Sequence, residues 1–487
     1  MDIAKGEILR RIRLNRKRLN DEMYRYPKIF TLGEEWPGDW TGRGILALVS
    51  LYKALEGYKE EQLDVKNQLD EIFLHLDEFI NQDGYLGKVF DFKILNEQQV
   101  SGNSWFLRGL IGYYKLTKNS KILNLIKKIF DNFILKLLPF YDKYNNHYNI
   151  QGEVSGRLSN IILDCWQYST DIGCAFIMLD SVGSYLEINP SLELLEFANH
   201  LINKFMEIDY VEKGLQTHAT LSCCRGILKC FEVSKNEKYL NYAKEIFENY
   251  LKYGMTLDYS NFNWFNKIDT WTEPCAIIDS FIVCTKLYKY TKLPKYQYYL
   301  NRIYFNALRG AQRSNGGAGC NTCLSSVNNE LKVHLYEAFF CCTMRFGEGI
   351  YFINKNVLFN NKEYIDINLL TDHYYEDEDK FIEINGNIYE DKVISIKTNF
   401  NKPLRIYLSE FIDIKSNVNL VRKDNYLLIN NPSEVKLEIN YQKHQENKMN
   451  FVGDMILTLK NKENTYSKIA SYIELDKEEA LKLTQHL

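Results

Sequence analysis

Residues 230–240, Cys-Phe-Glu-Val-Ser-Lys-Asn-Glu-Lys-Tyr-Leu, join the end of one apolar helical pattern to the start of an amphipathic one. Apolar residues recur at helical spacing on both sides of the polar turn. Related phrases stand at 51–57, 113–121 and 287–296, and a fainter one stands at 184–190. The first two-thirds of the chain is therefore predicted to be a series of helix pairs, each joined by a short turn.

Repeated helix pairs either stack into an open solenoid or close into a ring. With a helix near 4–25 and another near 336–349, the pattern gives about twelve helices, or six pairs. Six pairs predict an (α/α)6 toroid barrel over residues 1–349. The alternative is an open α-solenoid that binds partners. Long irregular segments favour the barrel, because they are expected as rim loops over a cavity; they are 82–101, 138–168, 254–272 and 313–333.

After residue 350 the pattern changes to alternation of apolar and polar residues with period two, interrupted by Asn, Asp and Gly. This pattern predicts strands, and the expected strands are 351–353, 363–369, 380–384, 392–398, 404–408, 435–441 and 455–459. We therefore expect an antiparallel β-sandwich domain over residues 350–487. A helical barrel followed by a sandwich is common among carbohydrate-active enzymes, which is an analogy between folds only.

The composition is that of an ordinary globular protein, with 45% hydrophobic and 25% charged residues and a net charge of −3, and this argues against nucleic-acid binding. No apolar run reaches membrane-spanning length, and the first residues lack the apolar core of a secretory signal. We therefore expect a cytoplasmic protein without a membrane partner, whose 11 cysteines are thiols or metal ligands. The oligomeric state stays open, with a homodimer as one alternative.

Two cysteine-containing segments suggest a metal site. Cys341 and Cys342 are adjacent, which is too close for an unstrained disulfide, and Glu273-Pro-Cys275 places a carboxylate two residues from a thiol. Three thiolates and one carboxylate form a plausible tetrahedral zinc site, because zinc is borderline-soft. The alternative is that these cysteines are buried packing residues. Residues 223–224 are also Cys-Cys but have no nearby Glu-x-Cys, so the pair alone is weak evidence.

A further pair, Cys320-Asn-Thr-Cys323, lies in a glycine-rich loop. This spacing is typical of a redox pair or of half a zinc site, and it also occurs without any ligand. No matching second Cys-x-x-Cys is present in the sequence, so the role of the pair stays open.

Four short segments resemble motifs of glycoside hydrolase family 127, the β-L-arabinofuranosidases, and of its relatives. Glu-Pro-Cys resembles the Glu-Thr-Cys of the family, and Cys-Cys resembles the start of its Cys-Cys-Pro-Pro-Asn. Gln-Thr-His-Ala-Thr resembles its Arg-His-Ala-Asn-Thr, and Asn-Ser-Trp-Phe-Leu-Arg-Gly resembles its Asn-Trp-Tyr segment. In this chain the four segments are 273–275, 341–342, 216–220 and 103–109.

The resemblance implies a retaining glycoside hydrolase with an (α/α)6 barrel followed by β-sandwich domains. It implies that Glu273, Cys275, Cys341 and Cys342 hold Zn²⁺, and that Cys341 is the nucleophile that forms a thioglycosyl intermediate. It also implies that His218 faces the sugar. Without the resemblance, a single histidine is more readily read as a core or helix-capping residue.

The chain departs from the family in two places. Thr343-Met-Arg345 stands where Pro-Pro-Asn is expected. The glutamate that acts as general acid and base in the family has no counterpart in residues 254–269, where Asp258 lies closest to the expected position. We therefore expect Asp258 to be the proton donor, and three further carboxylates are alternatives: Glu153, Asp164 and Asp269.

Three tryptophans fall in or beside the loops expected at the open face of the barrel. Trp40 and Trp105 are expected to contact the substrate, with Trp36 nearby, since aromatic rings stack on sugars. They could equally close the end of the barrel.

These observations predict a glycosidase that acts on a terminal furanose, such as β-L-arabinofuranose, of an oligosaccharide or glycoside. One alternative is a metal-free (α/α)6 epimerase or glycuronyl hydrolase. Another is a catalytically inactive, zinc-stabilised protein that binds a carbohydrate or a partner.

Overall fold

The computed structural model describes residues 1–144, 155–327, 334–430, 432–447 and 449–456. Its long helices confirm the helix pairs, because all five repeated phrases lie where one helix ends and the next begins. The long helices are α1 (Gly6–Arg18), α3 (Asp39–Ala54), α4 (Lys59–Leu74), α5 (Glu97–Thr117), α6 (Ser120–Ile129), α8 (Met178–Leu186), α9 (Leu192–Met206), α10 (Thr217–Ser234), α11 (Glu237–Tyr253), α12 (Pro274–Thr291), α13 (Pro294–Arg302) and α15 (Cys342–Lys355). Shorter helices are α2 (Lys28–Thr31), α7 (Leu138–Tyr141), α14 (Arg309–Ala311) and η5 (Cys174–Ile177).

The repeated phrase has a local explanation in the way these helices end. Lys118, Lys235 and Lys292 follow α5, α10 and α12, and each has a left-handed backbone with φ 57°. In the first two turns, Asn119 and Asn236 come next, and their side chains accept hydrogen bonds from the first turn of α6 and α11. These two phrases therefore terminate one helix and cap the next, whereas in the third the following helix begins at Pro294 without a side-chain cap.

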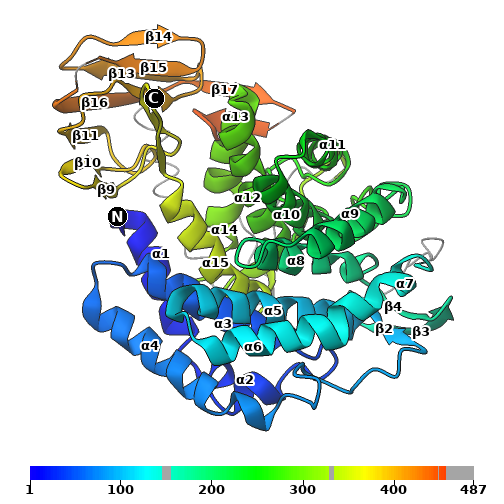
Figure 1. Cartoon of the computed structure of the whole chain (residues 1–487). Coiled ribbons are helices and arrows are strands. Elements are labelled where there is room, and N and C mark those ends of the chain that lie inside the picture. The colour runs from blue at the N-terminus through cyan, green and yellow to red at the C-terminus, as the bar shows by residue number, and fades with distance from the viewer. Residues whose placement is uncertain (145–154, 328–333, 431, 448, 457–487) are drawn as a thin grey trace.

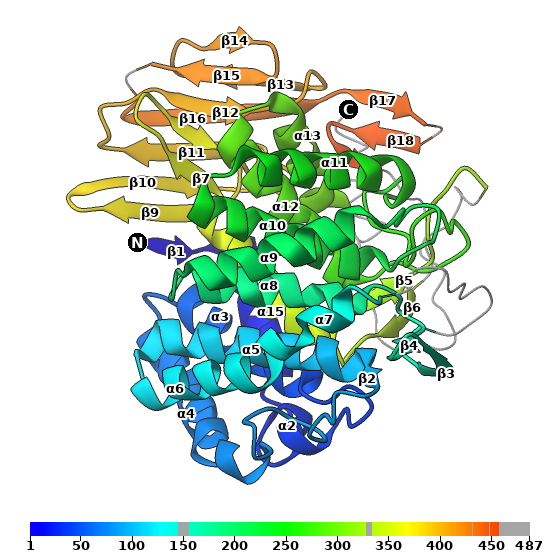
Figure 2. The ribbon, with the colours of Figure 1, turned by 45° about the vertical axis from the view of Figure 1, so that its right-hand side comes forward.

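Six of the long helices contact one another in a cyclic order. Helix α3 contacts α5, α5 contacts α8, α8 contacts α10, α10 contacts α12, α12 contacts α15, and α15 contacts α3 again. The remaining helices α4, α6, α9, α11 and α13 contact the member that precedes them in the chain, and α1 contacts α15. This is the contact order expected of a ring of six inner helices with outer partners (Figures 1 and 2).

Glycine allows the closest approach between neighbouring inner helices. A Cβ atom on Gly42 of α3 would lie 2.2 Å from the backbone nitrogen of Phe106 in α5, and one on Gly226 of α10 would lie 2.3 Å from the carbonyl carbon of Leu179 in α8. Any side chain there would force the helices apart. These contacts help to bring the N-terminal ends of the inner helices to one cavity.

The strands lie mainly at one end of the molecule, beyond the helices (Figure 2). A six-stranded sheet has the order β1-β9-β10-β11-β16-β13, and a five-stranded sheet has the order β14-β15-β12-β8-β7. Smaller sheets are β17-β18-β19, β2-β4-β3 and β5-β6. The strands are β1 (Asp2–Ala4), β2 (Leu95–Asn96), β3 (Leu158–Leu163), β4 (Trp166–Ser169), β5 (Gly319–Asn321), β6 (His334–Glu337), β7 (Leu358–Asn360), β8 (Ile365–Ile367), β9 (His373–Asp377), β10 (Lys380–Asn385), β11 (Val393–Thr398), β12 (Leu404–Tyr407), β13 (Ile412–Ser416), β14 (Val421–Lys423), β15 (Tyr426–Ile429), β16 (Glu434–Tyr441), β17 (Lys443–Glu446), β18 (Met449–Val452) and β19 (Met455–Ile456).

The predicted alternation is clear in these sheets. In β16, residues Val435, Leu437 and Ile439 are buried and their neighbours are exposed, so one face of this strand is covered. The sheets are not purely antiparallel as predicted, because β8 pairs in parallel with β12. The N-terminal β1 pairs with β9, so the start of the chain joins the C-terminal sheet.

The structure corrects two elements near residue 350. The helix expected at 336–349 runs instead from Cys342 to Lys355, and the strand expected at 351–353 is its last part. Phe346, Ile350 and Ile353 are fully buried at spacings of four and three, which is a helical period. The three residues 351–353 are too few to distinguish the helical period from the strand period of two. Of the strand expected at 455–459, only β19 lies among the described residues.

In the part of the chain that the structure describes, no helix combines the length and apolar character needed to cross a bilayer.

Candidate metal centre and active site

Glu273, Cys275, Cys341 and Cys342 come together although the 65 residues of 276–340 separate the two segments. One donor atom from each of the four side chains lies within 4.8 Å of all the others. The Sγ atom of Cys342 is 3.4 Å from that of Cys275 and 3.4 Å from that of Cys341. The convergence expected from the sequence is therefore present.

The local fold explains why these side chains meet. Glu273 is the residue that caps the N-terminus of α12, and Cys275 lies in its first turn after Pro274. Cys341 caps the N-terminus of α15, and Cys342 is its first residue. Because α12 and α15 are neighbours in the ring, both helix N-termini point their partial positive charge at one group of anionic donors.

The donor set fits a soft divalent metal such as zinc. Zinc is bound by thiolates at about 2.3 Å and by carboxylate oxygens at about 2.0–2.2 Å, so the edges of a tetrahedral sulfur site measure roughly 3.8 Å. The distances of 3.4 Å and the common limit of 4.8 Å are compatible with these edges. All three cysteines are free thiols.

The three thiols differ in their ionisation. Burial raises the pKa of the Cys275 thiol, but contacts from Cys341 and Cys342 and the nearby charges of His218 and Arg43 outweigh it and hold that pKa well below the ordinary value. The pKa of Cys341 is raised, mainly because its thiol donates to Cys275, and burial raises that of Cys342. Of the three, the Cys275 thiol is therefore the one that ionises most readily. A divalent metal would favour the thiolate form of all three.

A cavity of about 380 Å³ lies over the four donors. It is formed largely by residues at the N-terminal ends of the inner helices and by the loops next to them. Its polar lining is Asp39, Arg43, Ser101, Ser155, Asp171, Gln216, His218, Asn263 and Glu273, and its aromatic lining is Trp36, Trp40, Trp271, Tyr336 and Phe340. Cys341 and Cys342 also line it, whereas Cys275 lies behind the lining; Cys275 and Cys342 are fully buried and only Cys341 is partly exposed.

Arg43 connects the sulfurs to the rest of the cavity. Its Nη1 atom donates to the Sγ of Cys275 at 3.6 Å, and its Nε donates to Asp39 Oδ1 at 2.7 Å. The same guanidinium lies 3.3 Å from Nε2 of His218 and stacks over the Trp105 ring at 4.0 Å. Burial lowers the pKa of Arg43, but the charges of Asp39 and Cys275 outweigh it, so the pKa is raised and the group is a permanent cation.

Contacts with Asp279 and Trp105 hold the His218 ring in place. Its Nδ1 lies 2.7 Å from Asp279 Oδ2, which also accepts from Ser222 Oγ at 2.9 Å. The ring stacks on Trp105 with centroids 5.7 Å apart. Asp279 thus fixes the orientation of the ring, which leaves Nε2 facing Arg43 and the cavity.

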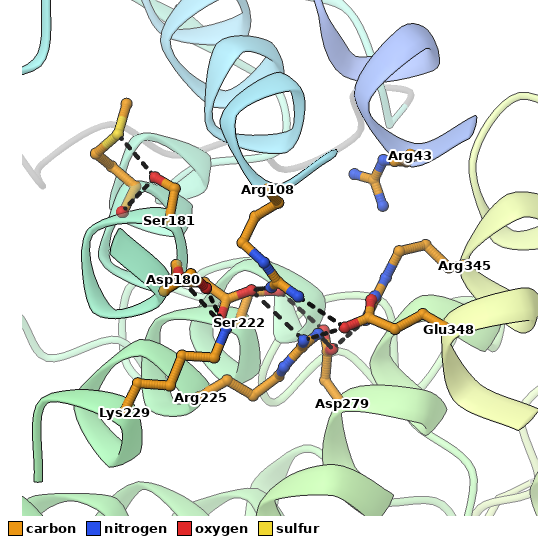
Figure 3. Close-up of polar contacts among 12 residues, drawn as sticks. Arg43, Arg108, Asp180, Ser181, Ser222, Arg225, Lys229, Asp279, Arg345 and Glu348 are labelled. Atoms are coloured by element: carbon orange, nitrogen blue, oxygen red, sulfur yellow. Dashed lines mark hydrogen bonds and ion pairs between the residues drawn. The ribbon is translucent and has the colours of Figure 1, made fainter. Parts of the chain in front are cut away.

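Beneath His218, charged side chains fill the space between the inner helices (Figure 3). The arginines point toward the carboxylates, and each charged side chain of this network is at most 10% exposed. The network comprises Arg108 of α5, Asp180 of α8, Arg225 and Lys229 of α10, Asp279 of α12, and Arg345 and Glu348 of α15. Buried charges are tolerated only when paired, so these contacts hold the helix positions on which the metal centre depends.

We expect Asp279→Asn to destabilise the protein by about 3–5 kcal/mol, because Arg225 and Arg345 lose a buried anionic partner. Burial raises the pKa of Asp279, but Arg345, Arg225 and His218 outweigh it and hold the pKa far below its ordinary value. Its stabilising contribution is therefore complete above about pH 4 and declines as the pH falls further. Denaturant unfolding at neutral pH measures the effect.

The matched control is Asp70→Asn, which removes the exposed partner of Lys66 on α4. An exposed pair contributes roughly 0–1 kcal/mol. Equal stability of the Asp279 and Asp70 variants would contradict a structural role for the buried network.

The structure places the other predicted site residues differently. The Asp258 carboxylate accepts hydrogen bonds from Thr256 and from Ser260 Oγ at 3.2 Å, and it is not among the described residues that line the cavity. Trp105 has no exposed surface and lies beneath His218, so its expected contact with a substrate has no support here. Trp40 does line the cavity, but its Nε1 donates to the Met23 carbonyl and its ring is 4% exposed.

The remaining candidates are not among the four donors, although the Cys320 thiol lies within hydrogen-bond reach of Cys342. Cys320 lines the cavity but is not a member of the donor group, and Cys323 Sγ lies 3.4 Å from the Asn261 carbonyl. Asp164 and Asp269 are exposed and do not appear among the described lining residues. Glu153 lies outside the described residues.

Sequence reasoning missed two residues of the cavity, Arg43 and Asp171. Arg43 stands four residues after Asp39 on α3, a spacing that pairs opposite charges on one helix face, so this signal was available. Asp171 lies in the loop between β4 and η5, and no motif in the sequence marked it.

No protein-family model and no curated protein matches this sequence. Solved structures do share its fold. A GH127 β-arabinofuranosidase is 11% identical, with a TM-score of 0.62 over 92% of this chain and 79% of that chain. A GH127 β-L-arabinofuranosidase from Geobacillus stearothermophilus T6 is 12% identical, with a TM-score of 0.59 over 93% and 80%. A protein described as a glycoside hydrolase is 11% identical, with a TM-score of 0.65 over 93% and 81%. The structural similarity to glycoside hydrolase family 127 expected from the motifs is confirmed at the level of the fold.

Proposed function

We propose that this protein is a retaining glycoside hydrolase in which Cys341, held in a zinc-thiolate group, is the nucleophile. The observation that carries the proposal is the position of Cys341. It is the only one of the three grouped sulfurs that is partly exposed; it lines the cavity together with Cys342, and both Cys342 and Cys275 are fully buried. The fold shared with glycoside hydrolases supports a carbohydrate substrate.

Glu273, Cys275, Cys341 and Cys342 would hold the metal, which would supply a positive charge that keeps the sulfurs deprotonated. The Cys341 sulfur attacks the anomeric carbon of the sugar, the bond to the leaving oxygen breaks, and a group in the cavity protonates that oxygen. Water then displaces the sulfur with help from the same group acting as a base. Two displacements restore the original configuration.

The cavity favours a small terminal sugar as the substrate. Its volume of about 380 Å³ lies at the lower end of the range for small-molecule sites. Trp36, Trp271 and Tyr336 offer apolar faces, while His218 and Gln216 offer hydrogen-bonding groups, a combination typical of sugar recognition. By similarity of fold, we take a furanose such as β-L-arabinofuranose as the first candidate.

We also infer the finer architecture. The cyclic helix contacts support an (α/α)6 toroid over residues 1–349, and the two large sheets support a β-sandwich domain after it. The boundary is not sharp, because α15 continues to Lys355 and β1 adds to the C-terminal sheet.

The test is to measure the metal content of the purified protein by mass spectrometry and its hydrolysis of a panel of aryl furanosides and pyranosides. The configuration of the first-formed product is followed by NMR. We expect one zinc per chain and release of a sugar with retained configuration. Zinc without hydrolysis would favour a zinc-stabilised binding protein, and hydrolysis without metal would favour a metal-free enzyme.

A further inference from the structure

Three carboxylates line the cavity among the described residues: Asp39, Asp171 and Glu273. Asp39 forms an ion pair with the buried guanidinium of Arg43, and Glu273 belongs to the four-donor group. Neither carboxylate is placed to give a proton to a leaving group. Among the described residues, Asp171 forms no ion pair and does not belong to the four-donor group. It is therefore the carboxylate available for proton transfer in the cavity.

The surroundings of Asp171 hold the carboxylate in place without neutralising its charge. Its Oδ1 accepts a hydrogen bond from Ser155 Oγ at 2.6 Å, and its backbone nitrogen donates to Ser169 Oγ at 3.1 Å. The residue is 5% exposed and therefore largely out of water. Trp36, another lining residue, donates from Nε1 to the Gly156 carbonyl at 3.0 Å, which fixes the neighbouring loop against the cavity.

We propose that Asp171 is the catalytic acid and base of this site, in place of the glutamate that is missing from residues 254–269. The inference rests on the proposed function. In the first step, the Asp171 carboxyl gives its proton to the leaving oxygen as the bond from that oxygen to the anomeric carbon breaks and the bond to Cys341 sulfur forms. In the second step, the Asp171 carboxylate takes a proton from water, whose oxygen bonds to the anomeric carbon as the sulfur leaves.

The ionisation of Asp171 is suited to both steps. Burial raises its pKa to about 6, although hydrogen bonds from Ser155 and the Gly156 backbone and the charges of His218 and Arg43 act to lower it. Glu273 and Cys174 are also close enough to Asp171 to interact with its charge. A group with a pKa near the working pH can both donate and accept a proton.

The experiment compares Asp171→Asn with Asp258→Asn, the rival acid, on two glycosides of the same sugar. One carries a dinitrophenoxide leaving group, which needs no protonation, and the other carries an alkoxide leaving group, which does. We expect Asp171→Asn to lower kcat/KM for the alkyl glycoside by about 10²–10⁴-fold and to keep kcat/KM for the dinitrophenyl glycoside close to that of the wild type, while kcat on the latter falls because the second step still needs a base. In the wild type, kcat/KM for the alkyl substrate should fall as the pH rises above about 6, and this limb should be absent in the variant.

A second variant, Asp171→Ala, keeps the test independent of the asparagine amide. Azide attacks a glycosyl-enzyme without a general base, so it should restore turnover of the dinitrophenyl glycoside and give a glycosyl azide of retained configuration. Unchanged zinc content and circular dichroism show that the variants are folded and loaded.

The outcomes separate the two proposals. A wild type that hydrolyses no glycoside overturns the proposed function and the role of Asp171 with it. A wild type that hydrolyses both substrates, with Asp171→Asn equally active on the alkyl glycoside or with the loss found in Asp258→Asn instead, overturns the role of Asp171 alone.

Discussion

Cys341→Ser should lower kcat/KM on the best glycoside by at least about 10³-fold while the protein stays folded. A serine hydroxyl is not ionised at neutral pH and is a much weaker nucleophile than a thiolate. Cys341 lies at the N-terminus of α15 and is partly exposed, so the exchange of sulfur for oxygen leaves no cavity in the core. Steady-state kinetics measures the loss, and circular dichroism checks the fold.

Cys284→Ser is the matched control. Cys284 lies on α12, the helix that also carries Cys275, and its Sγ donates a hydrogen bond of 2.9 Å to the Tyr296 carbonyl. Cys284 is not among the described residues that line the cavity. A serine can make the same hydrogen bond, so activity should stay within a few-fold of the wild type. If Cys341→Ser kept most of the activity, the nucleophile would have to be another group, and the thiol cluster would be structural.

The sequence predicted the local features of this protein well. Each Lys-Asn or Lys-Leu-Pro turn marks a helix boundary because those residues themselves end one helix and begin the next. The convergence of the two cysteine segments was also predicted, first from their donor chemistry and then from resemblance to a known family, although spacing along the chain does not say which helices are neighbours. Six of the seven segments predicted from alternation contain a strand, but most of the strands that the structure describes were not predicted. The parallel pairing of β8 with β12 depends on tertiary contacts.

Asp171 and Arg43 are cavity residues that were not predicted from the sequence. The Asp171 carboxylate becomes notable only because the loop between β4 and η5 places it at the same cavity as Cys341. Conversely, Asp258 occupied the expected position in sequence, but its carboxylate is held within its own loop by Thr256 and Ser260. A catalytic role that depends on which side chains meet at the cavity cannot be assigned from position in the sequence alone.

The negative charge of the four donors explains why Arg43 lies beside them. Three thiolates and a carboxylate around a divalent cation leave an excess of negative charge in a largely buried site, and such a charge needs compensation. Arg43 contacts Cys275 Sγ and is held between Asp39 and the Trp105 ring. The N-termini of α12 and α15 add a favourable dipole. The arginine would thus help to balance the charge of a metal bound by the four donors.

Cys275→Ala should reduce the zinc content from about one ion per chain to near zero and lower the melting temperature by several degrees. Cys275 contributes the sulfur that lies 3.4 Å from Cys342 and next to Arg43, so its loss leaves three donors and an unpartnered guanidinium. A metal present at about 1,000 times its dissociation constant stabilises the folded state by about 4 kcal/mol, and this contribution disappears with the site. Mass spectrometry and thermal unfolding, with and without chelator, measure both effects.

Chelator distinguishes loss of metal from loss of packing. It should lower the melting temperature of the wild type and of Cys284→Ala, which keeps all four donors, but it should leave that of Cys275→Ala unchanged. Cys284→Ala also controls for the cavity that a buried Cys→Ala change creates on α12. If the wild type binds no metal, or if chelator lowers the melting temperature of Cys275→Ala as much as that of the wild type, the three sulfurs are packing residues, and the proposed nucleophile loses the cation that would keep it ionised.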